Sequence, residues 1–278
     1  MTLGIGIIGA AGRMGRMLVE ASQQLDGFHL AAACDRAGGS AVGRDAGELV
    51  GLGALGVQVA EKVTEAVQAA DVVIDFSLPD ATERVASACA DAGRPLVLGT
   101  TGLGPEQQAA VDRLAEQVAV VQAANYSTGV TLLTALVEQA AHALGDSADV
   151  EIIEAHHRHK VDAPSGTALR LGEAVAGVLG RDLHEHAVYG REGQEGPRDR
   201  RTIGFETIRA GDIVGEHTVL FAGDGERLEL THKASRRSTF AFGAYRAAMW
   251  ASQQPPGRYD MRDVLGIAGS AAGIESPR

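Results

Sequence analysis

The chain has 278 residues, 45% of them hydrophobic and 22% charged, a composition typical of a globular protein that is large enough for two domains. Its net charge of −11 argues against general binding to nucleic acids or anionic membranes. The N-terminus runs directly into the apolar sequence LGIGIIG, and no run of 18 apolar residues follows, which predicts a cytoplasmic protein without a membrane span.

The first 127 residues alternate between short apolar runs and helical patterns. Strands are predicted at 3–8, 29–34, 71–76, 95–100 and 118–123, and helices at 14–25, 64–69, 81–92 and 105–117. Most of the strands are too uniformly apolar to have a solvent-exposed face, as expected of parallel strands that helices cover on both sides. The alternation predicts an α/β fold with a doubly wound parallel sheet.

After residue 127 the pattern changes. Helices are predicted at 128–144, 166–179 and 238–251, and strands at 149–156, 202–209, 214–222 and 226–234. Short links with glycine and aspartate separate the last three strands, which is typical of antiparallel hairpins. The polar, glycine-rich stretch 190–201 is predicted to be a mobile loop and 269–278 a frayed tail. We therefore expect one domain at 1–127, completed by 238–278, and a second at 128–237.

The sequence GAAGRMG, residues 9–15, follows the first strand and opens the first helix. Glycines here allow a tight turn and let a pyrophosphate approach the backbone amides at the helix N-terminus. The spacing departs from GxGxxG, because Ala11 and Met14 replace its second and third glycines. Glycine-rich turns after strands also occur for purely structural reasons, so the motif alone is weak evidence.

Asp35 ends the second strand 20 residues after this motif, where a carboxylate would accept hydrogen bonds from an adenosine ribose. A carboxylate favours NAD, whereas Arg36, helped by Arg13, would hold the extra phosphate of NADP. We expect both cofactors to work. The loops 99–102 and 123–127 follow two further strands at the same edge, and we expect them to contact the nicotinamide ribose and ring.

The segment 154–167, EAHHRHKVDAPSGT, combines several proton donors with a turn suited to anions. It contains three of the nine histidines (156, 157 and 159) and Lys160, one of only three lysines among 25 basic residues. Lysine beside imidazoles indicates a site that uses a titratable ammonium. Ser165–Thr167 offers hydroxyls and backbone amides at a predicted helix start. The combination predicts an active site.

The histidines could be metal ligands, packed core residues or proton-transfer groups. Zinc needs a third or fourth ligand at suitable spacing, and no cysteine or glutamate motif provides it. Consecutive side chains on an extended chain also point to opposite faces. We expect no metal, and at most two of the three histidines to act directly, with Arg158 and His159 shaping the cleft.

These motifs, together with DFSLPDAT, GTTG, AANYSTGV, RAGDIVGEHTV and THKAS, closely resemble those of the dihydrodipicolinate (4-hydroxy-tetrahydrodipicolinate) reductase family of the bacterial and plant lysine pathway. The resemblance extends from Gly4 to about Val264, and the family's own turn has the form GAxGRMG. It implies a Rossmann-like domain plus an α+β substrate-binding and oligomerisation domain with a mixed, mainly antiparallel sheet. It also implies a homotetramer that uses NADH and/or NADPH to reduce a cyclic dicarboxylate imine, with loss of water, in lysine and diaminopimelate biosynthesis.

The resemblance also assigns roles to residues. The catalytic proton donors would be His156 and Lys160. Substrate binding would fall to His157, Ser165, Gly166 and Thr167. The cofactor would be lined by Gly9, Ala10, Ala11, Gly12, Arg13, Met14, Asp35, Arg36, Gly99, Thr100, Thr101, Ala123, Ala124, Asn125 and Tyr126. Family members often have glutamate at position 35, so the shorter aspartate bears on the preference for NAD.

Two other functions are compatible with a dinucleotide-binding scaffold. A different oxidoreductase is one, but an aldehyde-type mechanism needs a nucleophilic cysteine, and Cys34 and Cys89 lie far from 154–167 in the sequence. Their spacing instead indicates two reduced thiols. A dinucleotide-sensing regulator is the other. It would need a DNA- or partner-binding module, against which the acidic charge and the lack of a spare domain argue.

Overall fold

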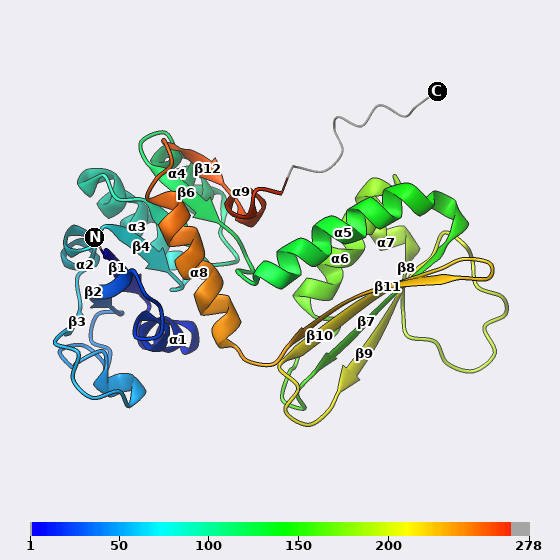
Figure 1. Cartoon of the computed structure of the whole chain (residues 1–278), viewed down its shortest axis with the longest axis horizontal. Helices are drawn as coiled ribbons and strands as arrows, with labels where there is room; N and C mark the ends of the chain where they lie inside the picture. The colour runs from blue at the N-terminus through cyan, green and yellow to red at the C-terminus, as the bar shows by residue number, and fades with distance from the viewer. Residues whose placement is uncertain (1, 268–278) are drawn as a thin grey trace. The chain divides into compact units, whose positions relative to one another are not determined.

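The computed structural model describes residues 2–267, which form two compact units (Figure 1). The first unit comprises the chain up to Thr128 together with Ser238–Gly266, and the second comprises Gly129–Arg237. The predicted tail at 269–278, and with it the end of the predicted first domain, lies outside the described residues. Within the described part of the chain, no helix has the length and apolar character needed to cross a membrane.

The first unit is built on a seven-stranded sheet in the order β12-β6-β5-β4-β1-β2-β3, with every pair parallel. Its strands are β1 (Leu3–Ile8), β2 (Phe28–Cys34), β3 (Val59–Ala60), β4 (Val72–Asp75), β5 (Leu96–Leu98), β6 (Ala119–Gln122) and β12 (Gly257–Tyr259). Its helices are α1 (Arg13–Ser22), the 3-10 turn η1 (Glu48–Val50), α2 (Val63–Ala69), α3 (Pro79–Ala92), α4 (Pro105–Ala115), α8 (Ser238–Ala251) and α9 (Met261–Leu265). The order of β1 to β6 is that of dinucleotide-binding folds.

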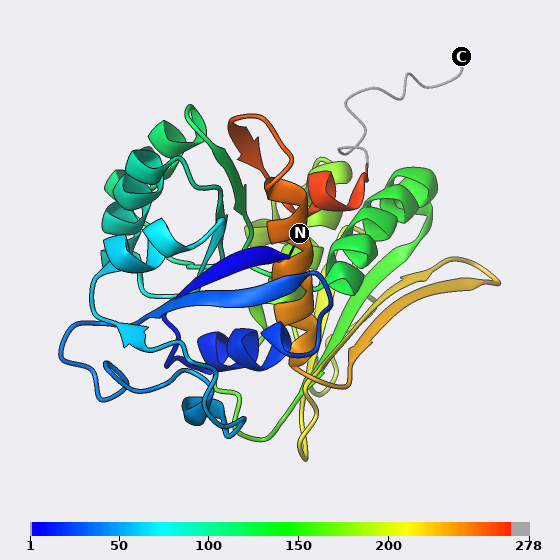
Figure 2. The ribbon, with the colours of Figure 1, turned by 60° about the vertical axis from the view of Figure 1, so that its left-hand side comes forward.

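Helices cover both faces of this sheet (Figure 2). Helices α1 and α8 pack on one face around Ile5, Ile7 and Tyr245, while α2, α3 and α4 pack on the other around Val73 and Leu96. Strand residues of both alternations are therefore buried, which is why their sequences are apolar throughout. The predicted doubly wound parallel sheet is confirmed.

The second unit contains a five-stranded sheet in the order β11-β10-β7-β9-β8. Its elements are α5 (Thr128–Leu144), the 3-10 turn η2 (Gly145–Ser147), β7 (Asp149–His156), α6 (Gly166–Val178), α7 (Leu183–His186), β8 (Ala187–Tyr189), β9 (Ile203–Arg209), β10 (Gly215–Ala222) and β11 (Arg227–Ala234). Helices α5 and α6 lie on one face of the sheet (Figure 1). Val150, Ile152, Phe205 and Val219 form the core beneath them, because alternate strand residues point to this face.

The link between β9 and β10 is not the hairpin that its glycine and aspartate indicated. Strand β7 lies between these two strands, antiparallel to β10 and parallel to β9. The link crosses the end of β7, where the amide of Ala210 donates to the carbonyl oxygen of His156 at 2.9 Å. The prediction was wrong because turn residues show where a chain reverses and leave open which strands pair.

The hairpin of β10 and β11 is confirmed. The sheet is mixed, as predicted, but its pairs divide equally into two antiparallel and two parallel pairs rather than being mainly antiparallel.

The loop at 190–201 contacts strand β7 through two arginines. Arg191 pairs with both oxygens of Glu151, at 2.8 and 3.0 Å. Arg198 reaches Glu151 and Asp149, each at 2.9 Å. These contacts anchor the loop to the face of the sheet opposite α5 and α6, and its mobility stays a prediction.

Candidate functional site

Polar side chains gather where strand β7 ends and the apolar layer beneath α6 stops. His156 is the last residue of β7, and Glu154, two residues earlier, points to the same face. In the sheet register, His217 of β10 lies opposite Glu154, and Arg209 of β9 lies opposite His156. Strand pairing therefore brings together residues that are more than 50 positions apart in the sequence.

Glu154 is the centre of this cluster and is only 1% exposed. Its Oε2 lies 2.6 Å from His156 Nδ1, and both of its oxygens accept hydrogen bonds of 2.8 Å from Arg209. The amide of Ser165 donates to Oε1 at 3.0 Å. Burial alone would raise the pKa of Glu154, but the hydrogen bonds from Arg209, His156 and Ser165 outweigh it and hold the pKa below its usual range. Glu154 is therefore an ionised carboxylate.

This charge fixes the protonation of one imidazole nitrogen of His156. An ionised carboxylate can only accept hydrogen bonds, so the network assigns a hydrogen to Nδ1 of His156. The other nitrogen, Nε2, lies against Gly215, where a Cβ atom would come within 3.1 Å of it. A glycine at this position of β10 thus leaves room for the ring, and Nε2 is the nitrogen that can exchange a proton.

Lys160 lies in the loop after β7. Its Nζ donates to both carboxylate oxygens of Asp162 at 2.8 Å, and the lysine side chain is 20% exposed. This hydrogen bond is the main reason that the pKa of Asp162 lies below its usual range. Arg209 also donates to the backbone oxygen of Asp162 at 2.6 Å, which ties the Lys160 loop to strand β9.

Ser165 caps the N-terminus of α6. Its Oγ accepts from the amide of Ala168 at 3.2 Å and lies 2.9 Å from Nε2 of His217. Burial lowers the pKa of His217 to about 4, so this histidine is neutral at physiological pH. Its ring meets that of His156 edge-on, with the ring centroids 5.2 Å apart. The helix start is therefore locked to the same cluster as His156.

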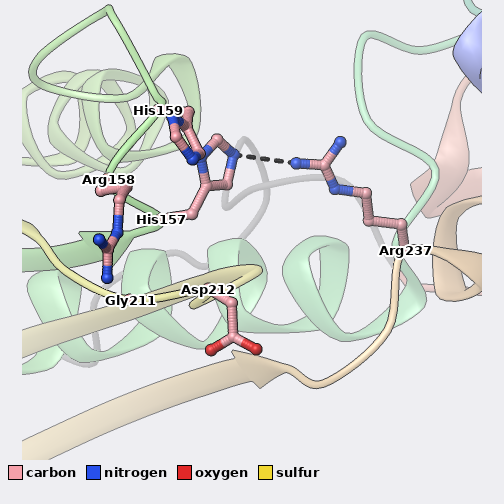
Figure 3. Close-up of a pocket in the computed structure, with 6 residues that line it drawn as sticks. All are labelled: His157, Arg158, His159, Gly211, Asp212 and Arg237. Carbon is pink, nitrogen blue, oxygen red and sulfur yellow. Dashed lines mark hydrogen bonds between the residues drawn. The ribbon is translucent and has the colours of Figure 1, made fainter.

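His157 and His159 line an open pocket of about 680 Å³ in the second unit, shown in Figure 3. Its other lining residues are Arg158, Gly211, Asp212 and Arg237. Nη2 of Arg237 donates to Nε2 of His157 at 2.9 Å (Figure 3). Burial and the charge of Arg237 lower the pKa of His157, which favours its neutral form. Two guanidinium groups against one carboxylate make the pocket suitable for an anionic ligand.

The predicted segment 154–167 is thus divided between two places. His156 and Ser165 belong to the buried cluster around Glu154, whereas His157 and His159 line the open pocket. Among the described residues, no group of three or more histidine, cysteine, aspartate or glutamate side chains is arranged to hold a metal ion.

The predicted cofactor residues all follow parallel strands of the first unit, so they lie at one edge of its sheet. The glycine-rich turn leads into α1, whose N-cap, Gly12, has no side chain to occupy the first amides of the helix. A Cβ atom on Gly15 would lie only 2.1 Å from the backbone oxygen of Gly9, so α1 can approach the turn only with glycine at this position. These features fit a pyrophosphate at the helix N-terminus.

Asp35 connects the turn to strand β2. Its Oδ2 accepts from the amide of Ala11 at 2.7 Å, and its Oδ1 accepts from the amide of Arg36 at 2.8 Å. The carboxylate thus lies beside the glycine-rich turn, as its predicted contact with a ribose requires. Tyr126 differs from the other predicted residues, because the whole residue is only 1% exposed and its hydroxyl bonds to the backbone oxygens of Leu98 and Val121. Its predicted contact with the cofactor stays a prediction.

Sequence reasoning missed four residues of these sites: Glu154, Arg209, His217 and Arg237. Glu154 carried a signal, since period-two alternation places it on the same face as His156. The others lie in later segments, and only the pairing of β7, β9 and β10 shows that Arg209 and His217 are neighbours of Glu154.

Family models for the N-terminus and the C-terminus of dihydrodipicolinate reductase match residues 3–126 and 129–265. The chain belongs to the dihydrodipicolinate reductase family. A 4-hydroxy-tetrahydrodipicolinate reductase from Halorhodospira halophila is 74% identical over 96% of this chain and all of the relative, and one from Alkalilimnicola ehrlichii is 64% identical over the same shares. Membership in this family of NAD(P)H-dependent reductases confirms the resemblance of the sequence motifs.

A solved structure has a fold similar to that of this chain. The dipicolinate-bound dihydrodipicolinate reductase from Paenisporosarcina sp. TG-14 has a TM-score of 0.74, with 24% identity over 94% of this chain and 98% of that one. A likeness at this identity concerns the fold, and it agrees with a parallel-sheet unit followed by a mixed-sheet unit.

Proposed function

We propose that this chain catalyses the NAD(P)H-dependent reduction of 4-hydroxy-tetrahydrodipicolinate to tetrahydrodipicolinate, with loss of water, in lysine and diaminopimelate biosynthesis. The observation that carries this proposal is the match of both halves of the chain to the dihydrodipicolinate reductase models, with 74% identity to a reductase of that name. The cluster at the end of β7 agrees with it, since it holds proton donors beside a helix N-terminus suited to a carboxylate.

The proposal is tested by following NADH and NADPH absorbance with substrate freshly made from aspartate semialdehyde and pyruvate. We expect oxidation of both cofactors, dependent on the substrate. If neither NADH nor NADPH is oxidised, a different oxidoreductase or a dinucleotide-sensing regulator would be favoured.

We assign cofactor binding to the first unit and substrate binding to the second. When bound, NAD(P)H supplies the hydride. The residues that would hold it are the glycine-rich turn at 9–14, the pair at 35–36 and the loops at 99–101 and 123–126. Their support is the common sheet edge and the uncapped start of α1. Arg36 follows Asp35 directly, which supports use of both cofactors.

Asp35→Asn is expected to lower kcat/KM with NADH by about tenfold or more, because the amide has one acceptor oxygen and cannot accept hydrogen bonds from both ribose hydroxyls. Asparagine keeps an oxygen for the amide of Ala11, so the turn itself should persist. The effect with NADPH should be smaller, since Arg36 would hold its phosphate. The measurement is the NADH to NADPH ratio of kcat/KM, with the exposed Asp26→Asn as control. An unchanged ratio would remove Asp35 from the cofactor site.

In the second unit, we assign proton donation to His156 and Lys160. Hydride addition leaves electron density on the neighbouring atom, which a nearby acid must protonate. Substrate carboxylates would be held by His157 and the turn Ser165–Thr167, including Gly166. Support comes from the guanidinium of Arg237, which donates to His157, and from the position of Ser165 at the start of α6. Charge-assisted contacts of this kind fix a small ring for reaction.

We further propose a cytoplasmic homotetramer that assembles through the sheet of the second unit. The face opposite α5 and α6 supports this assembly, because it carries the half-exposed Ile208 and the hydrogen-bonded pair Thr218 and Thr231. Sedimentation would give the subunit number.

A further inference from the structure

We infer that Glu154 is a positioning residue that sets two parts of the site at once: the proton-donating imidazole of His156 and the turn that begins α6. This inference rests on the proposed role of His156 in proton transfer. Glu154 itself does not need to touch the substrate, because it acts through the groups that it holds.

The two oxygens of Glu154 have different tasks. Oε2 lies 2.6 Å from Nδ1 of His156, and Oε1 accepts from the amide of Ser165 at 3.0 Å. Arg209 bonds to both oxygens at 2.8 Å and thereby fixes the rotation of the carboxylate. The carboxylate of Glu154 thus joins His156, the proposed proton donor, to the anion-binding turn that begins at Ser165.

The environment keeps this group charged. Glu154 is 1% exposed, and a buried carboxylate persists only with paired charge and hydrogen bonds. Arg209 supplies both. In the proposed step, Nδ1–H of His156 stays bonded to Glu154 while a proton on Nε2 is transferred. After the transfer the ring is neutral, with its hydrogen on Nδ1, and Glu154 is unchanged.

The contact with Ser165 has a separate consequence. Because the first amide of the turn is bound to Glu154, it is not a donor for a substrate carboxylate. Its bond instead fixes where α6 starts, and with it the position of Gly166 and Thr167. Losing Glu154 should therefore impair substrate binding as well as proton transfer, which distinguishes it from a residue that only orients His156.

The central test is Glu154→Gln, which keeps the size of the side chain but places a neutral amide between His156 and Arg209. We expect kcat to fall by at least about tenfold. The KM for substrate should rise severalfold, while the KM for NADH stays within about twofold of the native value, because the proposed cofactor residues lie in the first unit. A native kcat and KM in this variant would overturn the inference.

A double mutant separates positioning from general damage. In a His156→Ala background, Glu154→Gln should lower kcat by less than about threefold further, because residues that act as a unit are not additive. If the two losses multiply, Glu154 does not act through His156. If His156→Ala alone keeps native turnover, the proposed role of His156 fails instead, so the two failures are distinguishable.

Asp146→Asn is the matched control. Asp146 pairs with Arg181, whose side chain is 2% exposed and which follows the opposite end of α6. This change also takes a carboxylate from an arginine of the same unit, so it should lower the thermal midpoint while kcat is unchanged. A loss of kcat in Asp146→Asn equal to that in Glu154→Gln would show that destabilisation alone explains the effect.

A measurement on the native enzyme needs no variant to fold. Nitrogen chemical shifts of ¹⁵N-labelled histidine report which ring nitrogen carries the hydrogen. We expect His156 to carry it on Nδ1 when neutral. The opposite tautomer would overturn the inference, because Nδ1 could then not donate to Glu154.

Discussion

Lys160→Ala is expected to lower turnover by at least about a hundredfold, the contribution typical of a positioned proton donor. Lys160 is the lysine withdrawn from solvent: its side chain is 20% exposed, against 75% for Lys62 and 64% for Lys233. Its ammonium is held on Asp162, so the group is positioned before any ligand arrives. The measurement is kcat with saturating NADH and substrate.

Lys160→Arg separates proton donation from simple attraction of an anion. Arginine keeps the positive charge and can still pair with Asp162, but it gives up its proton far less readily. We therefore expect substrate KM near the native value and kcat as low as in Lys160→Ala. A high kcat in Lys160→Arg would reduce the role of Lys160 to binding. Lys62→Ala, an exposed lysine of the first unit, should leave turnover unchanged.

The parts of the fold that the sequence predicted well are those whose pattern is set by burial. Strand β7 and helices α5 and α8 begin and end where their apolar periodicity does. Strands β3 and β12 were missed, since runs of two and three residues carry no pattern of their own and form only by pairing with a neighbour.

Only those residues of the candidate site that lie close together in the sequence could be predicted from it. The segment 154–167 supplied His156 and Lys160, because these residues are close in sequence. Arg209 and His217 enter through the register of β9 and β10 on either side of β7. The expected hairpin between those two strands would have made them direct neighbours and left His156 outside the pair. The order of the strands in the sheet therefore decides the surroundings of Glu154. The hydrophobic periodicity of a single sequence does not reveal that order.

His156→Ala is expected to lower kcat by at least about a hundredfold as well, because it removes the group that Glu154 holds for proton transfer. Added imidazole should restore part of the lost turnover in this variant, since a free ring can enter the space left by the side chain and donate a proton. His142→Ala, an exposed histidine of α5, is the control and should behave as the native enzyme.

The chemical rescue makes this result specific. A histidine that only packed against His217 would leave a cavity whose filling improves stability but not kcat. Turnover that returns with imidazole concentration therefore points to proton transfer, whereas a rise of the thermal midpoint alone would show only that the cavity is filled. Near-native turnover in both His156→Ala and Lys160→Ala would refute the assignment of proton donation to this loop, and the acid would then have to be sought among the groups that line the pocket of His157 and Arg237.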